Sequence, residues 1–442
     1  MNYKSNVDFR KETLIKLLDI IIKHEDEIIQ ALFEDFKKSP FESVLTETSY
    51  VISELKDTIK NIKSWAKPKR VLPSLLNFPS TDYIYKEPYG TVLIITPWNY
   101  PFQLALCPLV SAVAAGNQVV VKPSELTPKT SAIIAKIIGK TFQKEHVEVI
   151  EGGVEITQKL LGQRWDYIFF TGSVPVGKIV AKAAAENLTP VTLELGGKNP
   201  CIIDETANLK LAAKRITWGK FINAGQTCIA PDYILIQEDM KSHFVDFLKT
   251  EITNAYGENP KLSPDFPRIV NEKNWLRLVN MIEPEKVLFG GLNDKEDYYI
   301  APTIIEENSL DSLIMKEEIF GPLLPILTYK EEEEISIIIS KYEKPLALYV
   351  FTDDNKFAKK IIENHSFGGG CINETVTHFS NKRLPFGGVG QSGIGAYHGQ
   401  LSFDTFSHHK GVVKKSTWLD MPMRYAPYAN KLASIKKLLN WL

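Results

Sequence analysis

Hydrophobic residues recur at helical spacing through the first part of the chain. Within residues 7–36 and again within residues 47–66, apolar side chains return every three or four positions, which predicts amphipathic helices. The first stretch fits one helix or a helix pair, and the second ends before Pro68. Prolines and a proline–serine pair punctuate residues 68–80, so we expect an ordered loop there. The apolar positions of the first stretch are Leu14, Leu17, Leu18, Ile21, Ile22, Ile28, Ile29, Leu32 and Phe33.

The pattern changes near residue 90 to short β-branched runs that alternate with apolar helical stretches. This alternation predicts a parallel, doubly wound sheet covered by helices. A second α/β run follows Gly197 and continues to about residue 390, and the acidic run 331–334 is placed to open a helix. The expected strands are 91–95, 118–121, 147–150 and 167–170, and the expected helices are 102–115 and 131–140.

Composition adds limits to this picture. A chain of 442 residues is too long for one ordinary core, so two or more domains are expected. A hydrophobic content of 44% and a charged content of 24% are typical of a globular protein, and a net charge of −1 gives no electrostatic footprint for nucleic acid. No apolar run reaches the ~20 residues of a membrane span, and the polar N-terminus shows no secretory pattern.

The cysteines and histidines suggest no metal site. The four cysteines are widely spaced and form no C-x-x-C pair, so neither a zinc site nor a disulfide framework is expected, and a reducing cytoplasm fits best. We interpret all eight histidines as structural or surface groups. The cysteines are Cys107, Cys201, Cys228 and Cys371.

The last twelve residues, 431–442, form a short basic amphipathic stretch. A helix packed on the protein or on a partner subunit is the favoured interpretation, since one short helix anchors poorly in a membrane. Weak peripheral contact with a membrane surface is the alternative.

Cys228 is the candidate for covalent chemistry. It ends the segment Phe221-Ile222-Asn223-Ala224-Gly225-Gln226-Thr227-Cys228, a polar setting in which a thiol can act as a nucleophile in its thiolate form. Glu194, in Leu193-Glu194-Leu195-Gly196-Gly197-Lys198, supplies a carboxylate that can take a proton from the thiol or from water. The alternative is that Cys228 is a small core residue, the usual fate of a free cysteine.

Two glycine-rich segments compete as the phosphate site of a nucleotide. The G-x-G-x-x-G at Gly388, Gly390 and Gly393 does not follow a β-branched strand and no acid lies about 20 residues further on, so we expect only a tight loop near the active site. The better candidate is residues 170–177, where a strand meets a helix N-terminus. There Thr171, Gly172, Ser173 and Gly177 face the expected anion, with both glycines allowing close backbone approach.

Together these motifs, in this order, resemble the active site of the aldehyde dehydrogenase superfamily. The resemblance runs from about residue 85 to residue 410 and is strongest to class 3, the group that includes fatty aldehyde dehydrogenases. It implies an α/β fold with a Rossmann-like cofactor domain, an α/β catalytic domain and a small oligomerisation strand element. The implied parts are residues 1–78 and 90–195 for NAD binding, 196–390 for catalysis, 79–89 and 400–425 for oligomerisation, and 426–442 as a C-terminal tail.

The resemblance also implies roles for single residues. Asn99 and the backbone N–H of Cys228 form an oxyanion hole, and Glu318 holds the nicotinamide ribose with Phe320 beside the ring. Lys122 and Glu125 bracket the adenine ribose, and this glutamate favours NAD over NADP, which class 3 members also use. The implied cofactor-binding set is Thr96, Pro97, Trp98, Lys122, Ser124, Glu125, Thr171, Gly172, Ser173, Gly177, Leu195, Gly196, Glu318 and Phe320.

The implied reaction is oxidation of an aldehyde to a carboxylic acid through a thioester on Cys228, hydrolysed with Glu194 as base. Medium- or long-chain aliphatic or aromatic aldehydes are the expected substrates, in a pocket that includes Tyr50, Trp98, Tyr100 and residues near His378 and Phe379. A homodimer is expected, as is common in class 3. The alternatives are an acyl-phosphate or coenzyme A-acylating reductase of the same fold, and a non-catalytic binding protein.

Overall fold

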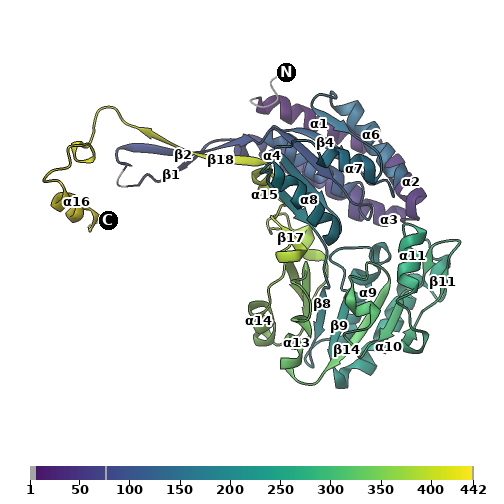
Figure 1. Cartoon of the computed structure of the whole chain (residues 1–442). Helices are drawn as coiled ribbons and strands as arrows, with labels where there is room; N and C mark the ends of the chain where they lie inside the picture. Colours follow the sequence, from purple (N-terminus) through teal and green to yellow (C-terminus); the bar gives the residue numbers. More distant parts are fainter. Residues whose placement is uncertain (1–5, 75–76, 441–442) are drawn as a thin grey trace.

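Two α/β lobes and a projecting arm make up the protein, seen in a computed structural model that describes residues 6–74 and 77–440 (Figure 1). The upper lobe contains a six-stranded sheet in the order β17-β7-β6-β3-β4-β5. Its strands are parallel except for β17, which pairs antiparallel with β7 at the edge. The strands are β3 (Thr91–Ile95), β4 (Gln118–Lys122), β5 (Val147–Val149), β6 (Tyr167–Thr171), β7 (Val191–Glu194) and β17 (Gly393–Ile394).

Helices cover both faces of this sheet, as the alternating pattern predicts. The apolar stretch 7–36 is a helix pair, with α1 (Val7–Lys23) capped by the Asn6 side chain and α2 (Glu25–Phe36) starting after His24. The predicted helix over 47–66 is the end of a longer helical segment that begins at Pro40 and contains a π-helical turn. The remaining elements are α3 (Pro40–Ser43), the π-turn η1 (Val44–Thr48), α4 (Ser49–Trp65), α5 (Gln103–Ala115), α6 (Pro128–Thr141), α7 (Val154–Leu161) and α8 (Val174–Glu186).

The lower lobe contains a seven-stranded sheet in the order β10-β13-β14-β9-β8-β15-β16, parallel except at β10. The acidic run does open a helix: Glu331 caps α13, and the Glu334 side chain bonds back to the cap in a capping box. Strands are β8 (Pro200–Ile203), β9 (Tyr233–Gln237), β10 (Val287–Phe289), β13 (Thr303–Glu306), β14 (Leu323–Tyr329), β15 (Ala347–Phe351), β16 (Gly369–Ile372) and a hairpin of β11 (Asn293–Asp294) with β12 (Tyr299–Ile300). Helices are α9 (Leu209–Phe221), α10 (Lys241–Tyr256), α11 (Glu272–Val279), α12 (Leu313–Lys316), α13 (Glu332–Ile339) and α14 (Asn355–Asn364).

Short 3-10 helices connect several of these elements. They are η3 (Ile222–Gly225), η4 (Glu238–Met240), η5 (Pro260–Leu262), η6 (Pro284–Lys286), η7 (Thr377–Ser380), η8 (Gly390–Ser392) and η9 (Pro422–Arg424).

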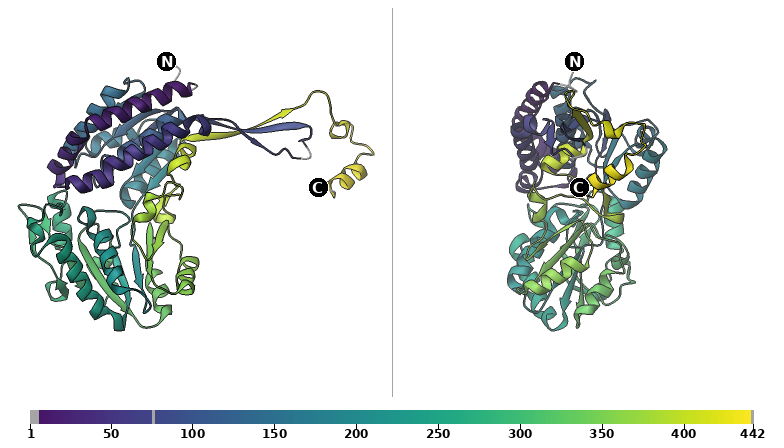
Figure 2. Two further views of the ribbon diagram at one scale, coloured as in Figure 1. Left: turned by 180° about the vertical axis from the view of Figure 1, so that it is seen from behind. Right: turned by 90° about the vertical axis from the view of Figure 1, so that its left-hand side faces the viewer.

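A three-stranded antiparallel sheet forms the arm, which extends away from both lobes (Figure 2). It consists of β1 (Lys69–Val71), β2 (Ser80–Pro88) and β18 (Ser407–Lys415), and it ends near α16 (Leu432–Leu439). The expected loop over residues 68–80 is therefore wrong in part: Lys69–Val71 is an edge strand paired with β2, because Pro68 precedes it and Pro73 follows it without interrupting the ladder. Residues 75–76, and the last two residues of the predicted tail, lie outside the described residues.

Another difference concerns the start of the expected strand element at residue 400. Residues Gly399–Thr405 form helix α15, which packs on α4 and α5 in the upper lobe, so the strand begins at Ser407.

Of the helices in the described ranges, none is both long and apolar enough to cross a membrane.

Candidate active site

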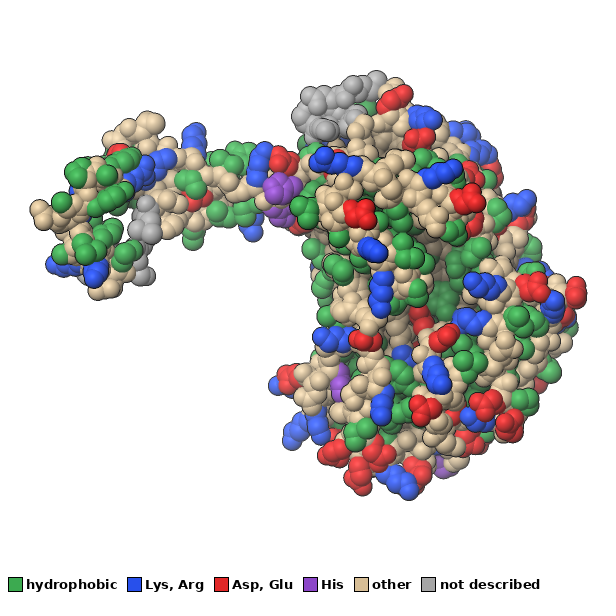
Figure 3. Space-filling model, viewed as in Figure 1, with side chains coloured by type: hydrophobic (Ala, Val, Ile, Leu, Met, Phe, Trp, Pro, Cys, Tyr) green, Lys and Arg blue, Asp and Glu red, His purple; other side chains and the backbone are tan. Residues whose placement is uncertain are grey.

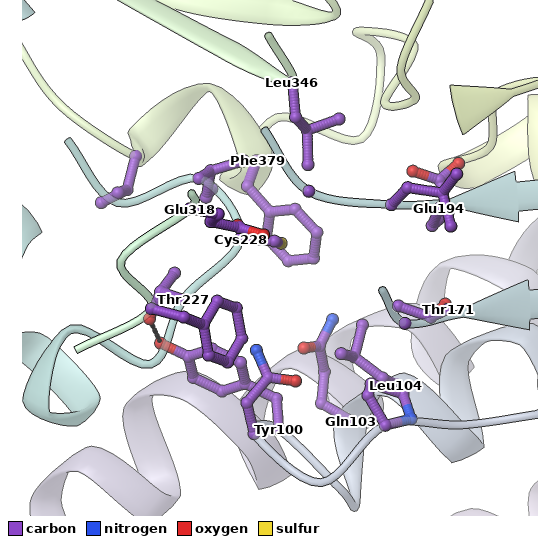
Figure 4. A pocket seen from close by; sticks show the side chains of 18 of the residues that line it. Tyr100, Gln103, Leu104, Thr171, Glu194, Thr227, Cys228, Glu318, Leu346 and Phe379 are labelled. Atoms are coloured by element: carbon purple, nitrogen blue, oxygen red, sulfur yellow. Dashed lines mark hydrogen bonds between the residues drawn. The ribbon is translucent and has the colours of Figure 1, made fainter. Parts of the chain in front are cut away.

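A cavity of about 720 Å³ lies between the two lobes and collects most of the predicted site residues (Figure 4). It receives side chains from the carboxyl ends of β3, β6 and β7 and from loops of the lower lobe, the place where parallel α/β sheets bind ligands. The predicted residues that line it are Pro97, Trp98, Asn99, Thr171, Gly172, Ser173, Glu194, Leu195, Gly196, Cys228, Glu318 and Phe320. Those that do not line it are Thr96, Lys122, Ser124, Glu125 and Gly177.

The Cys228 loop, residues 222–228, has an unusual backbone. Asn223 and Ala224 adopt positive φ angles of 55° and 52°, followed by Gly225 at 72°. Each non-glycine residue in this region costs roughly 1–2 kcal/mol, so the loop persists only because other groups hold it. The 3-10 assignment over Ile222–Gly225 covers this left-handed turn.

Hydrogen bonds from several elements hold the loop. The Asn223 amide donates to the Asn99 carbonyl at 2.9 Å, and the Gln226 amide donates to the Arg268 carbonyl at 3.0 Å. Asn199 donates to the Cys228 carbonyl at 2.8 Å. Asn199, Gln226 and Arg268 were not among the predicted site residues; only the amide-rich composition near Cys228 hints at such bonding.

Cys228 packs against the edge of the hydrophobic core and also faces the cavity beside Glu318 (Figure 4). Burial raises the pKa of the Cys228 thiol, and the nearby Glu318 and Glu194 carboxylates raise it further. These surroundings favour the neutral thiol, so covalent chemistry at Cys228 would need a base for its proton.

Glu194 lies at the carboxyl end of β7 and is almost fully buried, with 2% of its surface exposed. Neither of its carboxylate oxygens has a hydrogen-bond partner among the described residues, and burial raises its pKa well above the usual range. An unpartnered buried carboxyl group that faces a cavity has the properties of a general base.

The late glycine segment supports this strand end. Gly393 pairs with Glu194, and the Leu195 N–H donates to the Ser392 carbonyl at 3.1 Å. A Cβ on Gly393 would lie 2.6 Å from the Leu193 carbonyl oxygen, so only glycine fits. The expectation of a tight loop near the active site, without a phosphate role, agrees with this placement.

Asn99 lies in the loop between β3 and α5. Its side-chain nitrogen donates to the Gln226 carbonyl at 3.0 Å, which fixes the amide and leaves its second N–H for another acceptor. Asn99 is 3% exposed and lines the cavity with Cys228. The amide is thus oriented by the same loop that carries the thiol.

The β6–α8 turn, residues 171–177, has the local geometry of an anion site. β6 ends at Thr171, and α8 begins at Val174 with Pro175 in its first turn. The Ser173 side chain makes no cap hydrogen bond, and the Thr171 hydroxyl has no partner among the described residues. The free N–H groups of the helix start therefore face the cavity mouth with two uncommitted hydroxyls.

Gly177 differs from its predicted role. It is buried within α8, and a Cβ there would lie 2.6 Å from a methyl group of Leu195. Gly177 therefore lets the helix pack closely on the end of β7 and does not approach an anion. At Gly172 a Cβ would lie 2.5 Å from the Phe170 ring, so glycine is needed there too.

Lys122 is the last residue of β4, and Ser124 and Glu125 follow it, next to the end of β3 in the same sheet. Lys122 and Glu125 form an ion pair at 2.5 Å outside the enclosed cavity. The Ser124 hydroxyl accepts from the Leu126 N–H at 3.2 Å, so it is committed to its own turn. Thr96 joins this edge through its N–H, which donates to the Lys122 carbonyl.

Glu318 is held in the cavity by a loop that three charged side chains fix. Lys198 donates to the Glu317 carbonyl at 2.8 Å and pairs with Asp232, while Arg277 donates to the Ile319 carbonyl at 2.6 Å. Lys198 stands in the quoted Glu194 motif, but no sequence signal linked Asp232 or Arg277 to this loop.

The Glu318 carboxyl group rests against Gly196, where a Cβ would lie 2.1 Å from one of its oxygens. Burial, and then the Asp232 carboxylate, raise the pKa of Glu318 to about 8. One of its oxygens has no hydrogen-bond partner among the described residues. Phe320 lies edge-on to Trp98 with ring centroids 5.3 Å apart.

These groups fit a dinucleotide. The uncommitted oxygen of Glu318 can accept a ribose hydroxyl, the helix start of α8 can bind a pyrophosphate, and the space over Gly196 admits no side chain. Among the described residues no group of three or more histidine, cysteine or acidic side chains is arranged to hold a metal ion.

The other half of the cavity is apolar and aromatic. Of the residues predicted for the substrate pocket, Tyr50, Trp98, Tyr100 and Phe379 line it, whereas His378 does not. The sequence did not single out the further lining residues Leu45, Leu104, Trp218, Val376, Phe386 and Tyr397.

A cavity at the carboxyl ends of parallel strands, beside a turn that can bind a dinucleotide, is typical of the dinucleotide-dependent oxidoreductases. Comparison with known proteins narrows this class. The model of the aldehyde dehydrogenase family matches residues 3–412. A 4,4'-diaponeurosporen-aldehyde dehydrogenase of Staphylococcus aureus is 49% identical over 98% of this chain and 94% of its own length. Aldehyde dehydrogenase family 3 member H1 of Arabidopsis thaliana is 44% identical over 98% of this chain and 91% of its own length.

Solved structures agree. The substrate-bound state of Staphylococcus aureus AldH superposes with a TM-score of 0.97 at 49% identity and covers 99% of this chain and 96% of its own. An NAD+ complex of an aldehyde dehydrogenase from Bacillus cereus gives a TM-score of 0.84 at 28% identity, over 93% and 84% of the two chains. This chain belongs to the aldehyde dehydrogenase family: it is an oxidoreductase that acts on aldehydes with NAD(P) as cofactor.

Proposed function

We propose that Cys228 is the nucleophile, Glu194 the general base, and Asn99 with the Cys228 backbone N–H the oxyanion hole. One observation carries this assignment: the three side chains come from separate parts of the chain yet line a single cavity. Loss of one oxyanion donor typically lowers the rate by about 10²–10³-fold.

The reaction proceeds in two stages. Glu194 takes the thiol proton of Cys228 and passes it to solvent, and the thiolate sulfur attacks the aldehyde carbon, while Asn99 and the backbone N–H bind the oxyanion. A nicotinamide cofactor, which Glu318 and the β6–α8 turn would hold, would supply the hydride acceptor that the collapse of this adduct requires. The product on the protein is a thioester at Cys228, and Glu194 then takes a proton from a water molecule that attacks the thioester carbon. The C–S bond breaks, which releases the carboxylic acid and the thiol.

Glu318 and the β6–α8 turn are proposed to hold the cofactor at its ribose and pyrophosphate, with Phe320 beside the nicotinamide. Lys122 and Glu125 hold the adenine ribose. Because Glu125 would repel a 2′-phosphate, NAD is the preferred cofactor and NADP the alternative. Residues 1–78 and 90–195 act as the NAD-binding domain and residues 196–390 as the catalytic domain.

The proposed substrate is a medium- or long-chain aliphatic, or an aromatic, aldehyde. The aromatic half of the cavity supports this, because apolar walls favour a hydrocarbon chain. The relative named for 4,4'-diaponeurosporen-aldehyde supports a long apolar chain in particular.

The arm is proposed to join two copies in a homodimer. β18 leaves its outer edge open, and Val412 and Val413 are 40% and 50% exposed. Space-filling colours show hydrophobic side chains along the arm and the tail (Figure 3). An open edge with exposed valines is suited to pairing with a second chain, and the tail then packs on the partner.

Sedimentation of the wild type beside Val413→Lys tests this dimer: the wild type is expected to sediment as a dimer and the variant to shift toward a monomer.

The protein is proposed to be cytoplasmic, with membrane contact of the tail as the alternative. Binding to anionic vesicles that disappears on deletion of residues 431–442 would favour that alternative.

Turnover of decanal with NAD tests the function. The wild type is expected to form NADH, and Cys228→Ala to form none above background. Wild-type activity that survives in Cys228→Ala would refute the nucleophile.

Glu194→Gln separates hydrolysis from acyl transfer. Its thioester is expected to form and persist, giving a burst of NADH with little turnover and an acylated protein by mass spectrometry. Undiminished steady turnover in this variant would contradict the role of Glu194 as base.

Thiol labelling addresses the binding-protein alternative. Cys107 and Cys201 are buried, whereas Cys228 faces the cavity, so iodoacetamide is expected to modify Cys228 before them and NAD to alter its rate. Equal modification of all four cysteines, with no effect of NAD, would favour a binding protein.

A further inference from the structure

The two halves of the proposed oxyanion hole come from different lobes. Asn99 follows β3 in the upper sheet, whereas Cys228 precedes β9 in the lower sheet. Donors in an oxyanion hole act only when their positions match the developing charge, so the two loops must keep a fixed separation. The segment Lys38–Glu47, around α3 at the boundary between the lobes, contacts both (Figure 1).

Glu42 contacts the Cys228 loop. Its carboxylate accepts from the Asn223 N–H at 3.1 Å, at the first left-handed residue of the loop. Glu42 is 8% exposed, and burial raises its pKa to about 7 while Lys38 acts in the opposite direction. A protonated or an ionised carboxyl group can accept this bond, so the contact persists on both sides of neutral pH.

Glu47 contacts the Asn99 side. One of its oxygens accepts from the N–H groups of Phe102 and Gln103, at 3.0 and 2.9 Å, where α5 begins. A carboxylate at this place satisfies free N–H groups and the positive end of the helix dipole. It thereby fixes the start of the helix that directly follows the Asn99 loop.

Lys38 links the two contacts. Its ammonium group pairs with Glu47 at 2.8 Å, with both side chains fully buried. It also lies 4.1 Å from the centre of the Tyr100 ring. The Tyr100 hydroxyl in turn lies 2.6 Å from the Thr227 hydroxyl, one residue before the nucleophile (Figure 4).

A π-turn places the two glutamates together. Residues Val44–Thr48 are π-helical, and the Ser49 N–H bonds to the Val44 carbonyl five residues earlier. Glu42 lies in α3 directly before this turn and Glu47 lies within it, so one short segment carries both carboxyl groups. Both side chains therefore point into the protein from one short segment.

We propose that Lys38, Glu42 and Glu47 form a clamp that sets the distance between Asn99 and the Cys228 backbone N–H. These are positioning residues, because they touch the two loops and not the substrate. The inference rests on the oxyanion hole proposed above.

A double-mutant cycle with Asn99→Ala tests the clamp. Glu42→Ala removes the acceptor, so kcat is expected to fall about 10²-fold, whereas Glu42→Gln keeps an acceptor oxygen and most of the rate. Asn99→Ala alone is expected to lower kcat about 10²–10³-fold. In the Asn99→Ala background, Glu42→Ala should lower kcat by a much smaller factor. The geometry that Glu42 maintains then no longer positions an oxyanion donor at residue 99.

Two controls separate positioning from general destabilisation. Alkylation of Cys228 by iodoacetamide needs no oxyanion, so its rate is expected to change little in Glu42→Ala. Glu54→Ala removes another buried carboxylate from the same helical segment, one that pairs with Lys382 and bonds to neither loop, and it should act equally in both backgrounds. If Glu42→Ala does not fold, Glu42→Asp, which shortens the side chain, replaces it in the cycle.

If Glu42→Ala lowered kcat by the same factor in the wild type and in Asn99→Ala, the clamp alone would be overturned. Full activity of Asn99→Ala would overturn the oxyanion hole itself, and the clamp with it. The two failures are therefore distinguishable in one set of measurements.

Discussion

The Cys228 loop and the β6–α8 turn both serve one cavity, yet they are built in opposite ways. The turn is local: a strand ends, two residues follow, and a helix starts with a proline in its first turn. The Cys228 loop is strained at Asn223 and Ala224 and depends on bonds from distant parts of the chain. The proposed anion site is thus made by one short segment, whereas the loop of the proposed nucleophile depends on contacts from distant parts of the fold.

The largest effect is expected where the distant bonds of the loop converge. Asn223→Asp replaces an amide that donates to the Asn99 and Gln226 carbonyls with a group that repels both. We expect stability to fall by about 1–3 kcal/mol and kcat/KM to fall about 10²-fold. Chemical unfolding and steady-state kinetics measure the two losses.

The control for this change is Asn187→Asp at the exposed C-terminal end of α8, where neither quantity should change measurably. If Asn223→Asp kept wild-type stability and kcat/KM, the Cys228 loop would not depend on hydrogen bonds to other parts of the chain. It would then not differ in this respect from the β6–α8 turn.

A smaller and more selective effect is expected in the β6–α8 turn. Gly172→Ala places a methyl group 2.5 Å from the Phe170 ring, which shifts the helix start. We expect KM for NAD to rise about tenfold, equivalent to about 1.4 kcal/mol, with the rate of Cys228 alkylation unchanged.

Gly139→Ala in α6 provides the matched change, because a Cβ there meets nothing within 4 Å. It should leave KM unaltered and add about 0.5–1 kcal/mol of stability. If Gly172→Ala slowed Cys228 alkylation as much as it weakened NAD binding, the two regions would not be independent.

The smallest effect concerns the pH dependence of cofactor binding. Burial raises the pKa of Glu318 to about 8, so its carboxyl group is protonated below that pH and ionised above it. Only the ionised form accepts ribose hydroxyls at full strength, so Kd for NAD is expected to fall a few fold as pH rises through about 8. Fluorescence titration across this range measures it, and Glu318→Gln should show no such change.

The secondary structure was largely readable from the sequence. The strand β3 and the buried helix α5 follow from β-branched and alanine-rich runs whose periodicity reflects local sterics. The edge strand β1 was missed, because a three-residue strand between prolines has no periodicity and is stabilised only by pairing with β2. The packing role of Gly177 was not readable, because the contacting residue Leu195 follows strand β7 and is distant in sequence.

The motifs and their order indicated the family and the candidate residues for its chemistry. Motif residues such as Cys228 and Glu194 have reactive side chains whatever surrounds them, and their order identified the family. Tertiary structure decided their states: burial raises the pKa of both groups, and distant residues such as Asp232 and Glu42 fix the loops around them. The physical reason is that solvation and hydrogen-bond geometry depend on atoms that are close in space, and the fold alone brings those atoms together.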